Sequence, residues 1–397
     1  MSNIQIRPQR RVAFDTRWIY ENPSGIGIYT EAIAARIAAL RQDVNFVFLF
    51  NSNHLADSVM RKTGLINLQN VECKILPYGP LSIKNQFLLP KELRALNVDL
   101  YHGTNYMIPY GAFFGRASKI KCIATMHDVI PLVINDYAPN SRTSRMKKIY
   151  KFCLKQSVLR ADAVVTVSES SKRDIVGVLS LNSKHAERIH VIYNGASSCF
   201  TDVGKTDVKR DSQSLRRLLY VGRMDMYKNV AGLVESFANA SKKVPFPMRL
   251  IIAGANDSRY PEASAMVKKL GVENVVEITG FIDQEKLFDL YRTSDLLVHP
   301  SRYEGFGLQI VEAMKSGLPV CCTDGGSQPE IAGDAAFIVH AGNNEEMCNA
   351  IVALLSDPKK LESMRCAGIK RASNFDWDIA AEKISALYDG CFENNEK

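Results

Sequence analysis

Two glutamates enclose the segment of this chain that is best suited to binding a ligand. Glu304 and Glu312 bracket the seven residues GFGLQIV. Gly305 and Gly307 permit backbone conformations that aim successive N–H groups at one anion, and a helix expected from Leu308 onward adds the positive end of its dipole. Charged carboxylates accept hydrogen bonds from hydroxyl groups strongly. The segment therefore predicts a site for a phosphorylated sugar, with the first acid on the sugar and the second on a ribose diol. A first-turn acid that only complements the helix dipole is the alternative interpretation of Glu312.

A second loop supplies two cations. In YVGRMDMYKN, Gly222 ends a strand-like run, and Arg223 and Lys228 follow within six residues. An arginine offers paired hydrogen bonds and a lysine offers a point charge, so the two together suit a diphosphate. Exposure of both side chains on the surface, without a ligand, is the alternative.

Two further segments lie close to strand-like runs. His127 is the last residue but one of the run KCIATMHD, which leads into a loop with Pro131. A histidine that faces a ligand and a core histidine that is only hydrogen-bonded are both possible there. In the segment PSGIGIYT, Gly25 and Gly27 lie where a helix is expected to begin, so backbone N–H groups there can bind phosphate. The alternative interpretation is that the glycines only allow tight packing of the helix on a strand. Because Thr30 stands where the G-x-G-x-x-G fingerprint requires its last glycine, a nicotinamide enzyme is disfavoured.

These segments need a scaffold that brings strand ends together. Short apolar, β-branched runs alternate with helical periods, which predicts parallel sheets covered by helices on both faces. The alternation runs twice, and ligands of such sheets bind beyond the carboxyl ends of the strands. We predict two Rossmann-like domains that face each other across a cleft: residues 1–197, a linker at 198–214, residues 215–374, and a last helix within 375–397. The strand-like runs are 11–15, 45–50, 99–103, 121–128, 163–169, 189–194, 217–222, 249–254, 274–281, 296–301, 318–323 and 335–339.

Composition narrows the class of protein. About 46% of the 397 residues are hydrophobic, no run of 18 apolar residues occurs, and the first residues lack the apolar core of a signal peptide. The nine cysteines include no C-x-x-C pair, which argues against a zinc site or a disulfide framework. We therefore expect a cytoplasmic protein.

The net charge of +8 is distributed unevenly, because residues 1–200 carry +12 and the remainder −4. Such asymmetry predicts an anionic partner or surface for the first domain. The densest basic stretch, 142–160, has apolar residues at helical spacing: Met146, Ile149, Tyr150, Cys153, Leu154 and Val158. A solvated basic face is one interpretation, and a helix lying on anionic lipid head groups is the other. No nucleic-acid partner is expected.

Taken together, these motifs closely resemble the retaining glycosyltransferases of the GT-B fold in family 4, which includes many bacterial mannosyltransferases and glucosyltransferases. The resemblance covers most of the chain and rests on SGIG, TMHDVIP, VSESSKRDI, YNG, VGRMDMYKN and EGFGLQIVE. The spacing of the two glutamates is its most specific part. The resemblance implies a nucleotide-sugar donor held mainly by the second domain and a C-terminal helix that crosses back to the first.

The resemblance also implies roles for individual residues. Arg223 and Lys228 would hold the donor diphosphate, Glu304 would contact the transferred sugar, and His127 would lie beside that sugar. The remaining donor-binding residues would be Gly25 and Gly27 on the phosphates when the cleft closes, Gly222, Gly305, Phe306, Gly307 and Leu308 around the diphosphate and sugar, Ile282 at the base, and Glu312 at the ribose. Ile28 departs from the pattern, because many relatives place a basic residue there.

The implied reaction keeps the anomeric configuration without a protein nucleophile, a cofactor or an essential metal. The D-x-D of Asp376 and Asp378 opens the last helix, so helix capping is the better interpretation of it. The segments FDTRWIYENPSGIGIYT and HDVIP resemble the mannosyltransferase branch, which favours GDP-mannose as donor. UDP-glucose and dTDP- or GDP-deoxysugars stay open.

The acceptor expected from the basic first domain is a glycan or a lipid-linked saccharide. The setting would be bacterial polysaccharide or lipopolysaccharide O-antigen synthesis, with peripheral contact to an anionic membrane, at the inner face of the cytoplasmic membrane, through 142–160. Three other classes remain: a nucleotide-sugar epimerase of the same fold, a non-catalytic subunit that binds sugar nucleotides, and a two-domain dehydrogenase.

Overall fold

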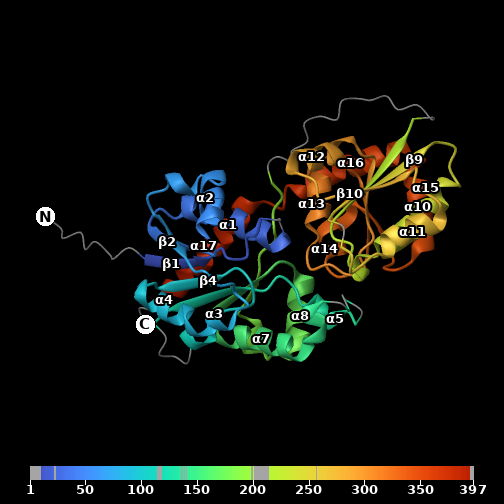
Figure 1. The fold of residues 1–397 in the computed structure, drawn as a ribbon. Helices are drawn as coiled ribbons and strands as arrows, with labels where there is room; N and C mark the ends of the chain where they lie inside the picture. Colours follow the sequence, from blue (N-terminus) through green and yellow to red (C-terminus); the bar gives the residue numbers. More distant parts are fainter. Residues whose placement is uncertain are drawn as a thin grey trace.

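The computed structural model describes residues 10–393, apart from 22–23, 114–118, 136, 138, 140, 198–199, 201–213 and 256. Two α/β bodies lie side by side, one built from each half of the chain (Figure 1). The predicted fold class, two parallel-sheet domains with helices, is confirmed. Of the predicted linker at 198–214, only residues 200 and 214 fall within the described part.

The first domain contains a seven-stranded parallel sheet with the order β3-β2-β1-β4-β5-β6-β7. Its central strands are buried on both faces, which is why they are continuous apolar runs in the sequence. The strand that the apolar pattern misses, β3, lies at the edge and exposes Glu72 and Cys73. The strands are β1 (Arg10–Asp15), β2 (Val44–Phe50), β3 (Val71–Ile75), β4 (Leu100–Gly103), β5 (Lys121–Thr125), β6 (Ala163–Thr166) and β7 (Ile189–Val191).

The helices of the first domain correct one prediction. The single helix expected over 142–160 is interrupted at Met146, whose backbone leaves the helical region at φ −118° and ψ 29°. The described helices are α1 (Gly25–Leu40), α2 (Asn53–Lys62), α3 (Ile83–Phe87), α4 (Leu89–Ala95), α5 (Ile130–Val133), α6 (Arg142–Arg145), α7 (Lys147–Arg160), α8 (Glu169–Leu179) and α9 (Ser183–Ala186), with the 3-10 turns η1 (Leu65–Asn67) and η2 (Tyr110–Ala112).

The second domain contains a six-stranded parallel sheet with the order β10-β9-β8-β11-β12-β13. Its strands are β8 (Arg216–Val221), β9 (Met248–Ala253), β10 (Val276–Gly280), β11 (Leu296–His299), β12 (Val320–Thr323) and β13 (Phe337–Val339). Its helices are α10 (Val230–Ser241), α11 (Glu262–Leu270), α12 (Gln284–Thr293), α13 (Leu308–Lys315), α14 (Gln328–Ala332), α15 (Asn344–Leu355) and α16 (Pro358–Ala372), with η4 (Met226–Lys228) and η5 (Gly333–Ala335).

Each sheet reverses its strand order once, between β1 and β4 in the first domain and between β8 and β11 in the second. In open parallel sheets this switch point is where the loops part and leave a crevice for a ligand. The loops that follow these four strands are therefore the ones to compare with the predicted site.

The last helix, α17 (Trp377–Glu393), returns to the first domain (Figure 1). Arg36 of α1 pairs with Asp378 at 2.6 Å, and buried His102 of β4 hydrogen-bonds to the Tyr388 hydroxyl at 2.8 Å. The Asp376 carboxylate accepts a hydrogen bond from the Asp378 N–H at 2.7 Å, so the D-x-D caps the helix as predicted.

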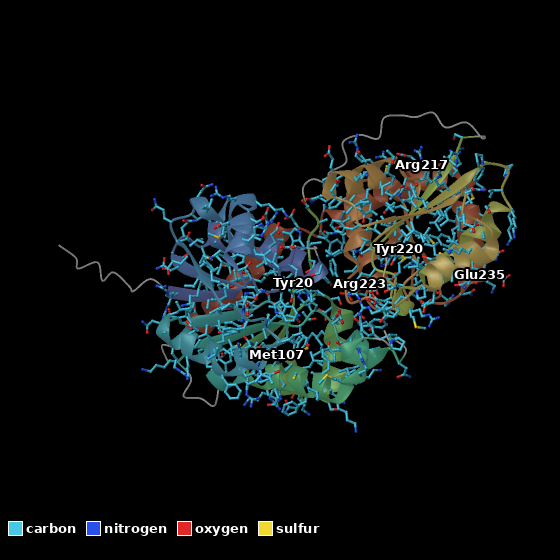
Figure 2. All side chains as sticks on the ribbon, in the orientation of Figure 1. Tyr20, Met107, Arg217, Tyr220, Arg223 and Glu235 are labelled. Carbon is cyan, nitrogen blue, oxygen red and sulfur yellow. The ribbon has the colours of Figure 1, made fainter. Side chains whose placement is uncertain are left out.

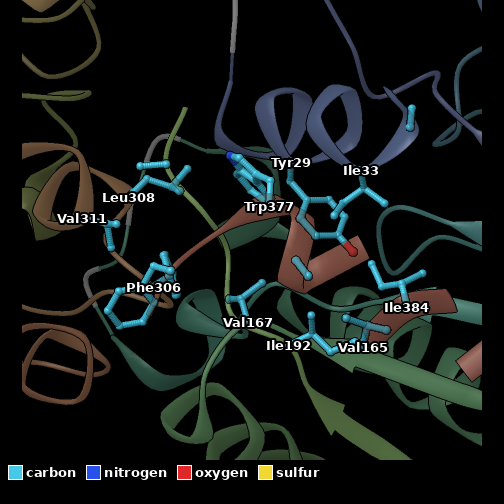
Figure 3. Close-up of a cluster of buried hydrophobic side chains, with 14 of the residues drawn as sticks. Tyr29, Ile33, Val165, Val167, Ile192, Phe306, Leu308, Val311, Trp377 and Ile384 are labelled. Carbon is cyan, nitrogen blue, oxygen red and sulfur yellow. The ribbon is translucent and has the colours of Figure 1, made fainter. Parts of the chain in front are cut away.

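A buried apolar cluster continues from one domain into the other (Figure 3). Tyr29 of α1 lies with its ring centre 6.0 Å from that of Trp377, and Phe306, just before α13, lies 5.9 Å from Phe375. Burying each such side chain contributes about 1.5–3 kcal/mol, so the cluster holds the loop before α13 against the first domain.

Candidate active site

Three polar side chains, those of buried His299 and Glu304 and of the largely buried Lys228, meet at the end of β11. The Glu304 Oε1 atom accepts hydrogen bonds from Lys228 Nζ at 2.6 Å and from His299 Nε2 at 2.9 Å. The side chains of Lys228 and Glu304 are only 13% and 8% exposed. Burial alone would raise the pKa of Glu304, but the charges and hydrogen bonds of Lys228 and His299 outweigh it and hold the pKa below its usual range. We call these three residues the Glu304 cluster.

The loop after β11 is held in place by its own backbone. The Glu304 main chain pairs with Gly326, and its carbonyl accepts hydrogen bonds from the Ser327 N–H at 3.0 Å and the Ser327 hydroxyl at 3.1 Å. Arg302 N–H donates to the Tyr227 carbonyl at 2.8 Å, which ties the same loop to the turn that carries Lys228. The carboxylate is therefore positioned by the ends of β8, β11 and β12 together.

The predicted glycine segment leads into α13 as the sequence indicates. Gly307 has φ +88°, a conformation that glycine adopts without strain, and it is followed by Leu308 at the first helical position. Gly305 lies so close to the first domain that an added Cβ would come within 2.7 Å of the Asp128 Cβ. The helix has no acidic residue in its first turn, so its positive end is not neutralised from within.

The first domain forms hydrogen bonds directly with this segment. The hydroxyls of Ser168 and Ser171, at the start of α8, donate to the Gly305 carbonyl at 2.7 and 3.1 Å. The Glu330 carboxylate of α14 accepts hydrogen bonds from the N–H groups of Glu169 and Ser170 at 2.7 and 2.9 Å. Residues of both domains thus surround the predicted anion-binding segment.

Glu312 is buried and does not touch the Glu304 cluster. Its Oε2 atom accepts a hydrogen bond from the Tyr291 hydroxyl at 2.8 Å. Burial raises the pKa of Glu312 to about 7, although the Tyr291 hydrogen bond acts to lower it. Near neutral pH the carboxyl therefore exists in both charged and neutral forms.

The two predicted cations occupy different environments. Arg223, after Gly222 at the end of β8, has 66% of its side chain exposed and pairs with Asp225 at 2.9 Å. Figure 2 shows Arg223 on the side of the second domain that is turned toward the first. Lys228 is instead buried, and Glu304 keeps its pKa raised although burial acts to lower it. The alternative interpretation, that both side chains are exposed on the surface, therefore holds for Arg223 and is wrong for Lys228.

His127 lies beyond the end of β5. Its Nε2 atom donates to the Thr104 carbonyl at 3.0 Å, and the Tyr29 ring packs edge-on at 4.8 Å between ring centres. Burial lowers the pKa of His127 to about 4, although the Thr104 carbonyl acts to raise it, so the ring is neutral at pH 7. Its remaining nitrogen, Nδ1, can accept a hydrogen bond.

The other predicted residues lie at their expected strand or helix ends. Gly25 and Gly27 fall in the first turn of α1, where the Ser24 hydroxyl accepts a hydrogen bond from the Gly27 N–H at 3.1 Å. Ile282 lies between β10 and α12 and packs on the apolar cluster. The neighbouring Phe281 ring is 61% exposed.

Sequence reasoning missed several members of the site. His299 ends β11 directly before Pro300, and that strand-end position was the available signal for it. Asp128 follows His127 and faces Gly305; burial raises its pKa to about 6, and Glu304 acts in the same direction. Nothing local to the sequence indicates that Ser168, Ser171 and Glu330 join the two domains.

No group of three or more His, Cys, Asp or Glu side chains in the described part of the chain is arranged to hold a metal ion. Among the same residues, no helix has the length and apolarity needed to cross a membrane.

The two halves of the chain match two glycosyltransferase family models. Residues 23–197 match the one described as Glycosyltransferase Family 4, and residues 207–371 match the one described as Glycosyl transferases group 1. Together the two matches span most of the chain, which therefore belongs to the group 1 and family 4 glycosyltransferases with the GT-B fold.

One curated relative and two solved structures illustrate what the chain is similar to. The O-antigen chain mannosyltransferase B of Escherichia coli is 25% identical over 393 residues, which are 95% of this chain and 99% of that protein. Sucrose-phosphate synthase from Thermosynechococcus elongatus has a TM-score of 0.76 at 19% identity, covering 97% of this chain and 100% of that one. Anabaena HepE, solved with UDP and glucose, has a TM-score of 0.73 at 20% identity, covering 96% and 100%. These two structures share the fold.

Proposed function

We propose that this chain is a retaining, metal-independent hexosyltransferase that moves mannose from GDP-mannose to a glycan or lipid-linked acceptor. The setting would be bacterial polysaccharide or O-antigen synthesis at the inner face of the cytoplasmic membrane. The observation that carries the proposal is the Glu304 cluster, buried beside the N-terminal end of α13. The likeness to an O-antigen chain mannosyltransferase supports the choice of mannose as the transferred sugar.

Glu304 is suited to hold the transferred sugar. Both Lys228 and His299 donate to its Oε1 atom, which fixes the carboxylate in one orientation. Among the described residues no hydrogen bond reaches Oε2, so this oxygen is available to a sugar hydroxyl. A carboxylate held ionised by its neighbours accepts such a hydrogen bond strongly.

The diphosphate would lie between Lys228 and the start of α13. Only one of the three ammonium protons of Lys228 is needed for Glu304, and the others can reach phosphate. The N–H groups at Gly307 and Leu308 and the helix dipole add partial positive charge. Arg223 would approach from solvent, and all these groups would stabilise the charge that develops on the leaving diphosphate.

The remaining candidate donor groups would contact the nucleotide in the order that we predict. Glu312 would bind the ribose through its Oε1 atom, because Tyr291 already donates a hydrogen bond to Oε2. Ile282 would contact the base, and the exposed ring of Phe281 offers a surface on which a base can stack. Gly25 and Gly27 begin a helix without an acid in its first turn, which suits phosphate when the cleft is closed. Neutral His127 would accept a hydrogen bond from the sugar.

A panel of nucleotides and nucleotide sugars, assayed by thermal shift, tests the donor. A ligand at 100 times its Kd stabilises the folded protein by about 2.7 kcal/mol, so GDP-mannose should raise the melting temperature more than UDP-glucose or deoxysugar nucleotides do. A larger shift with UDP-glucose would overturn the choice of mannose.

Product analysis tests the reaction. With a saccharide acceptor, NMR should detect an α-linked product from the α-linked donor, at an unchanged rate in EDTA. Formation of an altered free nucleotide sugar without acceptor would indicate an epimerase instead, and donor binding without any turnover would indicate a non-catalytic subunit. The Glu304→Gln variant serves as the inactive control.

A further inference from the structure

One side of α7 exposes apolar side chains to solvent. Ile149, Phe152 and Leu159 are 54%, 60% and 38% exposed. They are spaced by three and seven residues, so they lie on the same side of the helix. Leu154 and Val158, on the other side, are buried in the first domain. A row of exposed apolar side chains, unlike a single one, indicates a binding surface.

The same stretch of chain is strongly basic. Lys148, Lys151 and Lys155 lie within one turn of the exposed apolar side chains, and no Asp or Glu occurs between residues 137 and 161. Within the described part of the chain, none of these three lysines has a carboxylate at ion-pair distance. The charges are therefore available to an external anion.

A second exposed apolar patch lies on the short helix α3. Ile83 and Phe87 are one turn apart and are 78% and 68% exposed, and Leu81 just before the helix is 54% exposed. Lys84 lies between them, and residues 76–91 contain no acid. The patch therefore repeats the pattern of α7.

Tyr110 joins the two patches into one face. Its N–H donates to the Gln86 side chain of α3 at 3.0 Å, and its hydroxyl donates to the Cys153 carbonyl of α7 at 3.0 Å. Figure 1 shows α3 and α7 next to each other along one edge of the first domain. We call this surface the α3–α7 face and define it by Ile83, Phe87, Lys148, Ile149, Lys151 and Phe152.

We propose that the α3–α7 face docks the enzyme on the surface of a bilayer that contains anionic phospholipids. Its aromatic and branched side chains insert at the boundary between head groups and acyl chains, and its lysines pair with lipid phosphates. The surface of an anionic bilayer can bind both the exposed apolar side chains and the lysines, which have no acidic residue near them in the sequence. The inference widens the basic segment 142–160 into a two-helix face and assigns the inserted residues.

The face is connected to the candidate active site by one loop. Thr104, whose carbonyl accepts the His127 hydrogen bond, begins the loop that ends at Tyr110 between α3 and α7. Docking would therefore bring the acceptor side of the site close to the membrane, which suits a lipid-linked acceptor. This last step rests on the proposed function, whereas the docking itself does not.

Flotation of the full chain with phosphatidylcholine vesicles, with and without phosphatidylglycerol, tests the docking. The chain should float only with the anionic vesicles, and less at high salt. The changes Lys148→Gln and Lys151→Gln should each weaken binding about fivefold, since one basic side chain near an anionic surface contributes ~1 kcal/mol. The pairs Ile83→Ser/Phe87→Ser and Ile149→Ser/Phe152→Ser should each weaken it about tenfold or more.

Matched variants in the second domain serve as controls. Leu215→Ser/Leu270→Ser removes two exposed leucines, and Lys268→Gln/Lys269→Gln removes two exposed lysines, so neither should alter flotation. Unchanged melting temperatures of all variants would show that they fold. Equal flotation of wild type and the α3–α7 variants would overturn the proposal, as would concentration-dependent self-association that the same variants abolish.

Transfer to a water-soluble acceptor separates the two proposals. Variants that lose flotation but keep this activity leave both proposals standing. A chain that floats but transfers no sugar refutes the proposed function alone, and one that transfers sugar but never floats refutes the docking alone.

Discussion

Replacing Lys228 by methionine would test whether the Glu304 cluster serves stability and chemistry separately. The substitution keeps most of the side-chain volume but leaves the 8% exposed Glu304 carboxylate without its closest cation. Breaking a buried ion pair by removing one partner typically costs about 3–5 kcal/mol. For a domain of this size each kcal/mol corresponds to about 2–4 °C, so the second domain should melt about 6–20 °C lower.

The double variant Lys228→Met/Glu304→Gln is the matched control. It removes both charges, so no carboxylate is left buried and unpaired, and more than half of the lost stability should return. Transfer activity should fall by about 10²–10³ in both variants, because the stabilisation of the leaving diphosphate is lost in each. Melting curves and initial rates, measured on the same samples, give the two quantities.

The pH dependence provides a second check. In the wild type, the lowered pKa of Glu304 contributes stability that is complete above the ordinary carboxylate pKa and is lost as pH falls below it. In the Lys228→Met variant, burial should outweigh the remaining His299 hydrogen bond and raise the pKa of Glu304. The variant therefore loses stability as the pH rises and this carboxylate ionises. The gap between variant and wild type should therefore be smaller at about pH 5 than at about pH 8. A single variant that melts like the wild type, or a double variant that regains activity, would refute this reasoning.

Three other perturbations test separate parts of the site. Arg223→Ala should slow transfer by about 10²–10³ at an unchanged melting temperature, because the side chain is 66% exposed. A loss of activity accompanied by a lower melting temperature would contradict this. Tyr291→Phe removes the hydrogen bond that lowers the pKa of Glu312, so the KM for the donor should rise near pH 7 and recover near pH 8.5; a pH-independent KM would argue against it. Glu330→Gln weakens two charge-assisted hydrogen bonds to α8, so hydrogen exchange at the start of that helix should speed up while the interior of β12 stays protected.

Local signals in the sequence were sufficient for most of the fold. Apolar runs located every described strand except β3, whose exposed Glu72 and Cys73 break the pattern because an edge strand is covered less than a central one. The positive φ of Gly307 and the helix that follows it were also predictable, since glycine spacing is a local property.

The convergence of distant residues was not predictable in the same way. His299 and Lys228 reach one oxygen of Glu304 from different strand ends, and this depends on the register of the sheet rather than on spacing. Helical periodicity on 142–160 indicated one apolar side, yet Ile149 is exposed and Val158 is buried, because packing against the sheet decides which side turns inward.

The return of α17 to the first domain has a consequence for biosynthesis. The last strand of the first sheet ends at Val191, but Tyr388, which bonds His102 in that domain's interior, is translated almost two hundred residues later. At about 5–20 residues per second, the nascent first domain waits roughly 10–40 s for the helix that covers it. During that interval Tyr29 lacks its packing partner Trp377, so we expect chaperones that recognise apolar surface to bind the ribosome-bound chain.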